Sequence, residues 1–199
     1  RNKALKAAVE KPEKVKLFLN VDGNIIQDKA FIQGFTNRKA MKAGVPASDI
    51  VFEITERSDI ENYQILQQIM KHYADQGYEI ALDDVGAGHS GLNRVVNTTP
   101  DYLKADIELV RDIYKYKKKE IMMKLLLDYC NATGAILIAE GIETVQELEC
   151  LHSLGVHYGQ GFFLGKPERA FGNISAESEE ILERLNGRKN ILFLDISGK

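Results

Sequence analysis

Cysteine and long apolar runs are scarce in this 199-residue chain, and each scarcity excludes a class of protein. Its two cysteines, Cys130 and Cys150, form no Cys-x-x-Cys pair, which argues against a disulfide scaffold, a zinc site or a redox pair. We expect both to be reduced thiols. Apolar runs such as residues 135–139 and 191–194 are far below the roughly 20 residues that span a bilayer, and no signal peptide is visible. The sequence predicts a cytoplasmic domain without membrane contact of its own, although a membrane-anchored parent protein could carry it.

The chain also lacks a surplus of basic residues. It has 26 Lys+Arg against 29 Asp+Glu, a formal net charge of -3, whereas a general nucleic-acid binder normally shows a basic face. We therefore expect no DNA binding. With 44% apolar residues and a length that buries roughly 70% of the unfolded surface, the composition is that of one soluble globular domain.

Short apolar runs alternate with stretches of helical period, the pattern of repeated βα units around a parallel sheet. The expected strands are residues 15–21, 50–54, 79–82, 102–105, 136–139 and 156–162. Helices are expected over residues 60–76, 120–133 and 144–154, each followed by a glycine stop signal. The last of them opens with the capping box Thr144-x-x-Glu147.

Polar residues close five of these runs: Asn20, Glu53, Asp83 with Asp84, Lys104, and Glu140. In a (β/α)8 barrel the carboxyl ends of the strands converge on one face, so these side chains would gather around one pocket. The 140 residues from Asn20 to Gln160 contain five strand-to-strand steps, 28 residues each. We predict a modified TIM-type α/β barrel over residues 1–168 with about six of eight strands present. Residues 169–199 would form a helix (175–186) and a strand (190–196), as an extension or the start of a further segment.

The polar cluster offers hard oxygen ligands without His or Cys, a set that suits Mg²⁺ or Mn²⁺. Four carboxylates in one pocket would repel each other, so two ions are expected, and two ions about 3.5–4 Å apart are the usual machinery for displacement at phosphorus. Each residue also has a purely structural interpretation. Glu53 fits a half-exposed strand, Asp83 and Asp84 a turn, Glu140 a helix N-terminus, and Lys104 a strand edge. Their shared position in successive βα units favours the metal site.

These motifs resemble the EAL domain, the bacterial phosphodiesterase of cyclic di-GMP. The matching segments are Leu19-Asn20-Val21, Glu53-Ile54-Thr55-Glu56, Asp83-Asp84-Val85-Gly86-Ala87-Gly88, Leu103-Lys104-Ala105-Asp106, Glu140-Gly141-Ile142-Glu143-Thr144, Gln160-Gly161-Phe162 and Lys166-Pro167. The resemblance covers about residues 4–168. It implies hydrolysis of cyclic di-GMP to linear pGpG in bacterial second-messenger signalling, with Mg²⁺ or Mn²⁺ as the working ion.

The resemblance also implies roles for individual residues. The implied metal ligands are Asn20, Glu53, Asp83, Asp84 and Glu140. Lys104 would position the hydrolytic water, with Gln160 near that water, and Glu143 would steady the loop that contains Gly86 and Gly88. Asp106, Gln160 and Pro167 would contact the substrate. A homodimer and a sensory or GGDEF domain in the parent protein are implied as partners.

The Glu-Ala-Leu motif that names the family is absent, because it belongs to a strand upstream of Arg1. The chain is therefore either a piece of a longer enzyme or a degenerate domain that binds cyclic di-GMP or a partner without cleaving the dinucleotide. A barrel hydrolase for another phosphate ester is a third reading. Lesser departures are Val85, His89 and Gly91, where the family usually has Phe, Tyr and Ser.

Overall fold

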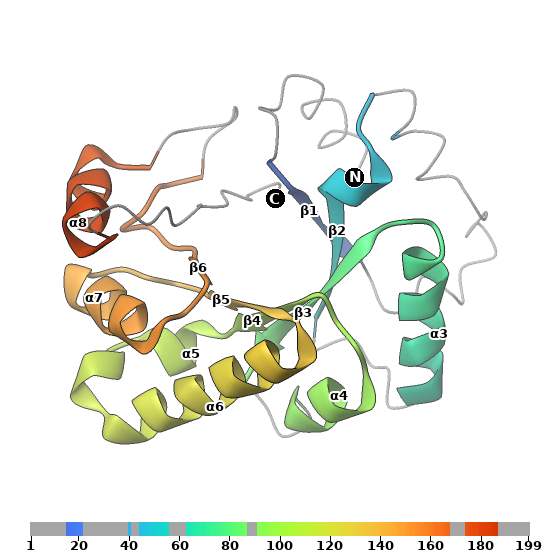
Figure 1. Ribbon diagram of the computed structural model, residues 1–199, viewed down its shortest axis with the longest axis horizontal. Helices are drawn as coiled ribbons and strands as arrows, with labels where there is room; N and C mark the ends of the chain where they lie inside the picture. Colours follow the sequence, from blue (N-terminus) through green and yellow to red (C-terminus); the bar gives the residue numbers. More distant parts are fainter. Residues whose placement is uncertain are drawn as a thin grey trace.

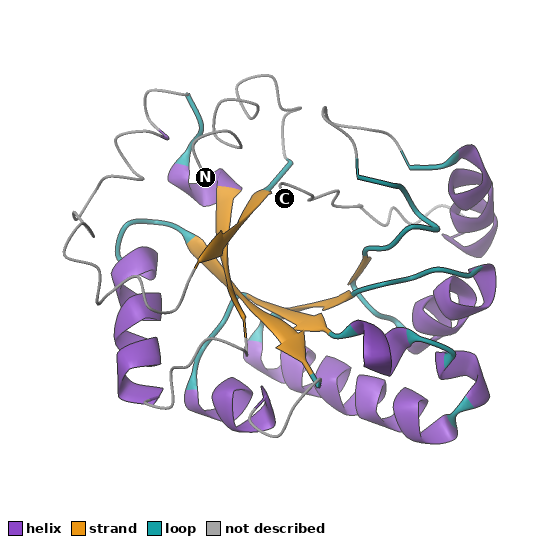
Figure 2. Cartoon of the chain, turned by 180° about the vertical axis from the view of Figure 1, so that it is seen from behind, coloured by secondary structure: helices purple, strands orange, loops and turns teal. Residues whose placement is uncertain are grey.

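The computed structural model describes residues 15–21, 40, 44–55, 63–86, 91–167 and 174–186. Within them, six parallel strands form one curved sheet in the order β1-β2-β3-β4-β5-β6, with helices on its convex side (Figures 1 and 2). The strands are β1 (Leu17–Val21), β2 (Ile50–Thr55), β3 (Glu79–Val85), β4 (Tyr102–Ala105), β5 (Ile136–Ala139) and β6 (Tyr158–Gly159). The described residues thus form an incomplete barrel, as the sequence predicted.

The helices follow the strands in the expected alternation. They are η3 (Ala47–Asp49), α3 (Tyr63–Ala74), α4 (Gly91–Asn97), α5 (Ile107–Val110), η4 (Ile113–Lys115), α6 (Lys117–Thr133), α7 (Val145–Leu154) and α8 (Ala176–Asn186). The predicted capping box of α7 is present, and Gly134 and Gly155 end α6 and α7 in left-handed conformations. The tail helix is α8, while the expected strand 190–196 lies outside the described residues. None of the described helices is both long and apolar enough to cross a membrane.

Four strand predictions were wrong in their bounds: β1 begins at Leu17 instead of residue 15, β2 ends at Thr55 instead of residue 54, and β3 and β6 differ by more. β6 is only Tyr158–Gly159 instead of residues 156–162, because the chain turns at Gly161, whose α-carbon packs so closely that a Cβ would lie 2.1 Å from the Ile142 carbonyl oxygen. β3 continues to Val85 instead of ending at Leu82, with its register to β4 shifting between these two residues. The irregularity coincides with Asp84, which has a φ of 59°.

The sheet buries a different set of side chains on each face. On the convex face, residues such as Leu19, Phe52, Ile80, Leu103 and Leu137 join the apolar side chains of the helices in the main core. On the concave face, a smaller cluster forms from Phe18, Val51, Ala81, Tyr102 and Ile138. Successive side chains in a strand point to opposite faces, so residues two positions further along each strand also face inward.

That rule places the polar strand ends. Asn20, Glu53, Asp83, Lys104 and Glu140 each follow a residue of the concave cluster by two positions. The parallel register places Asn20 opposite Glu53, whereas Asp83 and Glu140 lie two residues beyond the partners of Glu53 and Lys104 on the neighbouring strands. The polar residues therefore lie together at the carboxyl end of the sheet, inside the curve.

Candidate metal centre

Lys104 lies at the centre of the site and forms ion pairs with carboxylates from three other elements. Its Nζ lies 2.5 Å from Glu53 Oε1 on β2, 2.9 Å from Asp83 Oδ1 on β3, and 2.7 Å from Glu140 Oε1 after β5. The Lys104 and Glu53 side chains are each only 5% exposed. One cation thus faces three carboxylates, and the cluster carries an excess of negative charge.

Burial and the neighbouring charges alter the pKa values of the cluster. Burial would lower the pKa of Lys104, but the carboxylates of Glu140, Glu53 and Asp83 outweigh it, so the pKa is raised and the ammonium stays protonated. Burial raises the pKa of Glu53, against the opposing effect of Lys104. Burial, with a contribution from Asp83, raises the pKa of Glu140 to about 7. Burial thus favours the neutral form of these two carboxyl groups, and Lys104 offsets this effect only in part.

A second group of oxygens overlaps with the first. Asp83, Asp84 and Glu140 each offer one carboxylate oxygen to this group, and the three oxygens lie within 4.8 Å of one another. Hard oxygen donors without nitrogen or sulfur suit Mg²⁺, Mn²⁺ or Ca²⁺, and a divalent ion would supply the missing positive charge. The donor set therefore fits such an ion. Asn20 is level with Glu53 on the neighbouring strand and is exposed at the strand end, which leaves its amide oxygen accessible.

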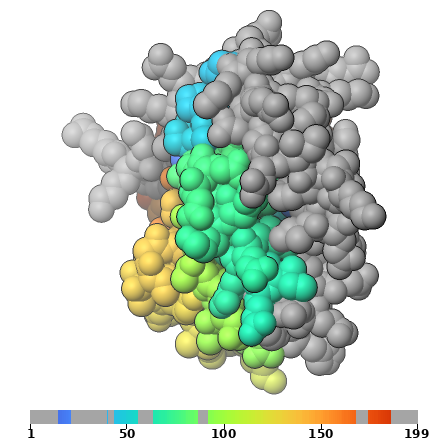
Figure 3. Space-filling view, turned by 90° about the vertical axis from the view of Figure 1, so that its right-hand side faces the viewer, coloured from blue at the N-terminus to red at the C-terminus, as the bar shows by residue number. Residues whose placement is uncertain are grey.

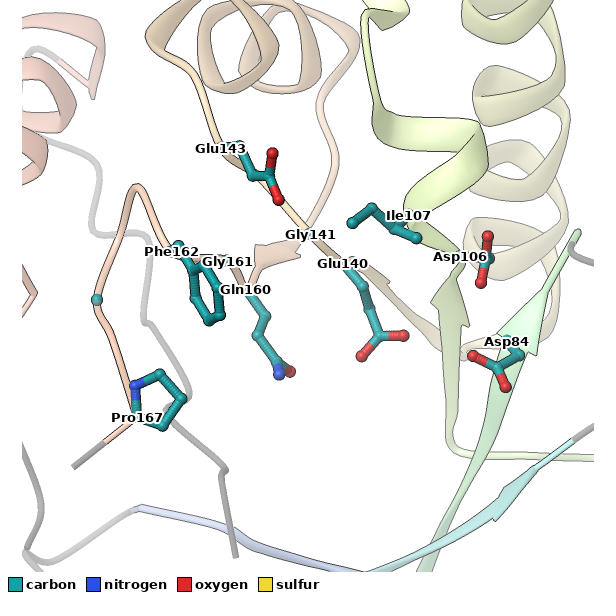
Figure 4. A pocket seen from close by; sticks show the side chains of 11 residues that line it. Asp84, Asp106, Ile107, Glu140, Gly141, Glu143, Gln160, Gly161, Phe162 and Pro167 are labelled. Carbon is teal, nitrogen blue, oxygen red and sulfur yellow. The ribbon is translucent and has the colours of Figure 1, made fainter. Parts of the chain in front are cut away.

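A pocket of about 280 Å³ opens beside the acidic group (Figure 4). All three residues that the sequence predicted as substrate contacts, Asp106, Gln160 and Pro167, line this pocket, together with Glu140 and Glu143. Asp106 also caps α5, because its Oδ1 accepts a hydrogen bond from the Glu108 amide at 2.7 Å. The remaining lining residues are Asp84, Ile107, Gly141, Gly161, Phe162 and Gly165. The pocket therefore brings residues of the acidic group together with the residues that the sequence predicted as substrate contacts.

Phe162 is the most exposed of the lining residues that the sequence did not predict as site residues, the others being Ile107, Gly141, Gly161 and Gly165. Its side chain is 63% exposed, the second largest value among the exposed large apolar residues of the described chain. The signal was an aromatic residue directly after Gln160-Gly161, which was assigned to a buried strand. The short β6 brings it to the surface instead.

The loop residues are less completely described. Gly86 has a φ of 104°, a conformation that favours glycine, whereas Gly88 lies outside the described residues. Glu143 lies at the pocket, and its Oε1 is 3.5 Å from the Arg111 guanidinium. Its expected contact with the loop after Asp84 falls largely on residues 87–90 and stays a prediction.

The chain is similar in sequence to a protein family and to several named proteins. The family model of the EAL domain matches residues 2–167. The cyclic di-GMP phosphodiesterase PdeB of Shewanella oneidensis is 25% identical over 150 residues, which are 75% of this chain and 17% of that protein. PdeF of Escherichia coli K12, named likewise, is 29% identical over 142 residues, 71% of this chain and 19% of that protein. The chain thus spans less than a fifth of the length of these curated relatives.

Solved structures agree with the sequence relatives. BlrP1 of Klebsiella pneumoniae, in complex with calcium and cyclic di-GMP, superposes with a TM-score of 0.80 at 30% identity, covering 87% of this chain and 44% of that one. A standalone EAL protein of Vibrio cholerae O395, bound to cyclic di-GMP, gives a TM-score of 0.79 at 27% identity, covering 89% and 76%. Since the family model also spans most of the chain, this protein belongs to the EAL domain family.

Proposed function

We propose that the intact protein hydrolyses one phosphodiester bond of cyclic di-GMP, giving linear pGpG in bacterial second-messenger signalling. The observation that carries this proposal is the acidic group Asp83, Asp84 and Glu140 around Lys104, at the edge of a pocket lined by Asp106, Gln160 and Pro167. Family membership and relatives bound to cyclic di-GMP with calcium or manganese support it.

Two divalent ions, Mg²⁺ or Mn²⁺, would be held by Asn20, Glu53, Asp83, Asp84 and Glu140. They would supply Lewis-acid polarisation of the phosphoryl oxygens and neutralise the carboxylates. Lys104 is proposed to position the attacking water. Its three ion pairs occupy its three N–H donors, so it would donate to that water once bound ions draw a carboxylate away from it. Gln160, directly after β6, would offer its side-chain amide to the same water, and Glu143 is proposed to steady the loop of Gly86 and Gly88.

Hydrolysis assays of the full-length protein test this function. Cyclic di-GMP is incubated with Mg²⁺, with Mn²⁺ or with EDTA, and the products are separated by chromatography. We expect pGpG only with a divalent ion. If the protein binds the dinucleotide but leaves it intact under all three conditions, the domain is a sensor and the phosphodiesterase proposal fails. Cleavage of other phosphate esters in preference to cyclic di-GMP would favour the third reading.

We also propose that two copies associate through α4 and α6. Leu92 and Val96 on α4 are 53% and 75% exposed, and Ile121 and Leu125 on α6 are 52% and 58% exposed. The Tyr129 hydroxyl donates to the Val95 carbonyl and links the two helices. α4 reaches the molecular surface in the side view of Figure 3. Sedimentation of wild type and Leu125→Asp tests this surface, and a monomeric wild type would refute it.

A cytoplasmic location is part of the same proposal. Cys130 is buried and Cys150 half-buried, and both are free. Burial raises the pKa of Cys130 to about 11, which makes this thiol unreactive. A sensory or GGDEF domain elsewhere in the parent protein would supply the regulatory input, and the domain itself would contact neither DNA nor a membrane.

A further inference from the structure

Two segments from different parts of the chain line the pocket and meet beside it. The first is the loop of residues 140–144 between β5 and α7, which contains Glu140, and the second is residues 106–116 after β4 (Figure 4). Gly141 packs so closely on Ile107 that a Cβ would lie 2.3 Å from its Cγ1. The position of one segment therefore limits that of the other.

Glu147 in the first turn of α7 connects the same two segments. Its Oε1 accepts a hydrogen bond from the Asp112 amide at 2.8 Å. Its Oε2 accepts from the Glu143 and Thr144 amides, at 2.9 Å and 3.0 Å. Each oxygen of one carboxylate thus binds a different segment, so the length and shape of this side chain set the spacing between them.

The burial of Glu147 makes this connection unusual. The residue is 2% exposed, and among the described residues no lysine or arginine forms an ion pair with it. Its charge is balanced instead by three N–H donors and by the N-terminus of α7. A capping box needs only the bond to the N-cap amide, so the bond to Asp112 is additional to the cap.

The backbone conformation of Asp112 also indicates that this segment is held in place by its contacts. Asp112 has a φ of 57°, a left-handed conformation that an L-residue keeps only where its surroundings determine it. The Glu147 carboxylate holds the N–H of this residue. The turn is therefore fixed from the α7 side, and with it the segment that begins at Asp106.

We propose that Glu147 is a positioning residue for the metal centre. It does not touch the proposed ions. Through the Glu143 and Thr144 amides it fixes the loop that contains Glu140, and through Asp112 it holds that loop against the opposite wall of the pocket. This inference rests on the proposed function, since it requires that Glu140 ligates a divalent ion.

The test is Mn²⁺ binding by the full-length protein, measured from the electron paramagnetic resonance signal of the free ion. Loss of a group that supports a metal ligand typically weakens binding by about 10-fold to 100-fold, and we expect a rise of that size in the Mn²⁺ dissociation constant of Glu147→Ala. Glu147→Gln keeps the length of the side chain but has a single acceptor oxygen, so it can hold one segment only and should weaken Mn²⁺ binding less than Glu147→Ala does. Hydrogen exchange of peptides covering residues 106–116 and 140–147 should be faster in Glu147→Ala.

A second variant, Glu147→Asp, tests the proposal even if Glu147→Ala does not fold. Aspartate keeps the charge but is one methylene shorter, so it can reach one segment but not both, and it should also weaken Mn²⁺ binding. The matched control is Glu79→Ala. Glu79 accepts hydrogen bonds from Lys16 and Tyr102 at the amino end of β3, so its loss should lower the melting temperature without changing Mn²⁺ affinity.

The outcomes separate the two proposals. Glu147→Ala and Glu147→Asp that bind Mn²⁺ like the wild type, with only a lower melting temperature, would overturn the positioning role and leave the proposed function standing. An equal loss in Glu79→Ala would also overturn it, because the effect would then be general. A wild type that binds no Mn²⁺ and cleaves no cyclic di-GMP would refute the proposed function itself.

Discussion

Replacing Lys104 by methionine tests whether one buried cation holds the three carboxylates together. Methionine keeps an apolar stem of similar length and removes the charge. The side chains of Glu53, Asp83 and Glu140 are only 5%, 14% and 16% exposed, so without a divalent ion they would face each other with little solvent screening. We therefore expect Lys104→Met to be strongly destabilised in EDTA at pH 8.

The magnitude follows from the burial of the pairs. Removal of one partner of a buried ion pair reduces stability by about 3–5 kcal/mol. In a domain of this size 1 kcal/mol corresponds to roughly 2–4 °C, which gives a fall in melting temperature of roughly 6–20 °C. The control is Lys71→Met, whose ion pair with Asp75 is exposed at both side chains and contributes about 0–1 kcal/mol.

Thermal unfolding with EDTA and with Mn²⁺ measures the effect. An ion that binds only the native state stabilises that state, and Mn²⁺ should recover more stability in Lys104→Met than in the wild type. Lower pH should also reduce the difference in melting temperature between Lys104→Met and the wild type in EDTA. The raised pKa values of Glu53 and Glu140 mean that the folded state takes up protons as pH falls from 8 to 5, and a neutral carboxyl needs no cation. A Lys104→Met protein that melts with the wild type in EDTA at pH 8 would refute the reasoning.

Three further changes test other parts of the structure. Glu140→Ala should abolish turnover of cyclic di-GMP by the intact protein, and near-normal activity would contradict its assignment as a metal ligand. Gly141→Ala should lower stability by about 2–5 kcal/mol in urea denaturation, from its φ of 71° and the contact with Ile107, whereas a neutral effect would show that the two segments can separate. His157 accepts a hydrogen bond from the Leu137 amide through Nδ1, and burial lowers its pKa from 6.5. The folded state therefore resists protonation, so wild type should lose stability relative to His157→Asn as pH falls below 6.5, and parallel pH profiles would argue against this.

The sequence predicted the metal centre because two simple periodicities coincide there. Strand side chains alternate with a period of two, and βα units repeat about every 28 residues, so a polar residue at each strand end lies inside the curve. Glu53, Asp83, Lys104 and Glu140 satisfy both conditions, and the structure brings these four together. Helices α6 and α7 were predictable for a similar reason, since capping boxes and glycine stop signals are local, whereas α4, α5 and the short η3 and η4 were not predicted.

Contacts that depend on loop geometry could not be predicted in this way. The bond from Asp112 to Glu147 joins residues 35 positions apart, and nothing in the local pattern of either segment indicates it. The early end of β6 depends on how closely Gly161 packs on Ile142, so Phe162 was expected in a strand and is exposed at the pocket instead. The sequence also placed Lys104 in the site without indicating that three carboxylates would share its ammonium.

Charge balance explains why only one end of the concave face is suited to metal binding. At the amino end, Lys16 forms an ion pair with Glu79, which also accepts a hydrogen bond from Tyr102. The hydroxyl satisfies the remaining oxygen of Glu79, and the nearby Asp101 carboxylate accepts a hydrogen bond from the Ile80 amide. At the carboxyl end the same geometry gives one cation, Lys104, to three carboxylates, with Asp84 close to two of them. Among the described residues the charges are therefore closer to balance at the amino end, whereas the carboxyl end has the excess of carboxylates that the proposed ions would neutralise. Exchanging Glu79 for glutamine should accordingly leave metal affinity unchanged, while any single neutral substitution among the three carboxylates should weaken it.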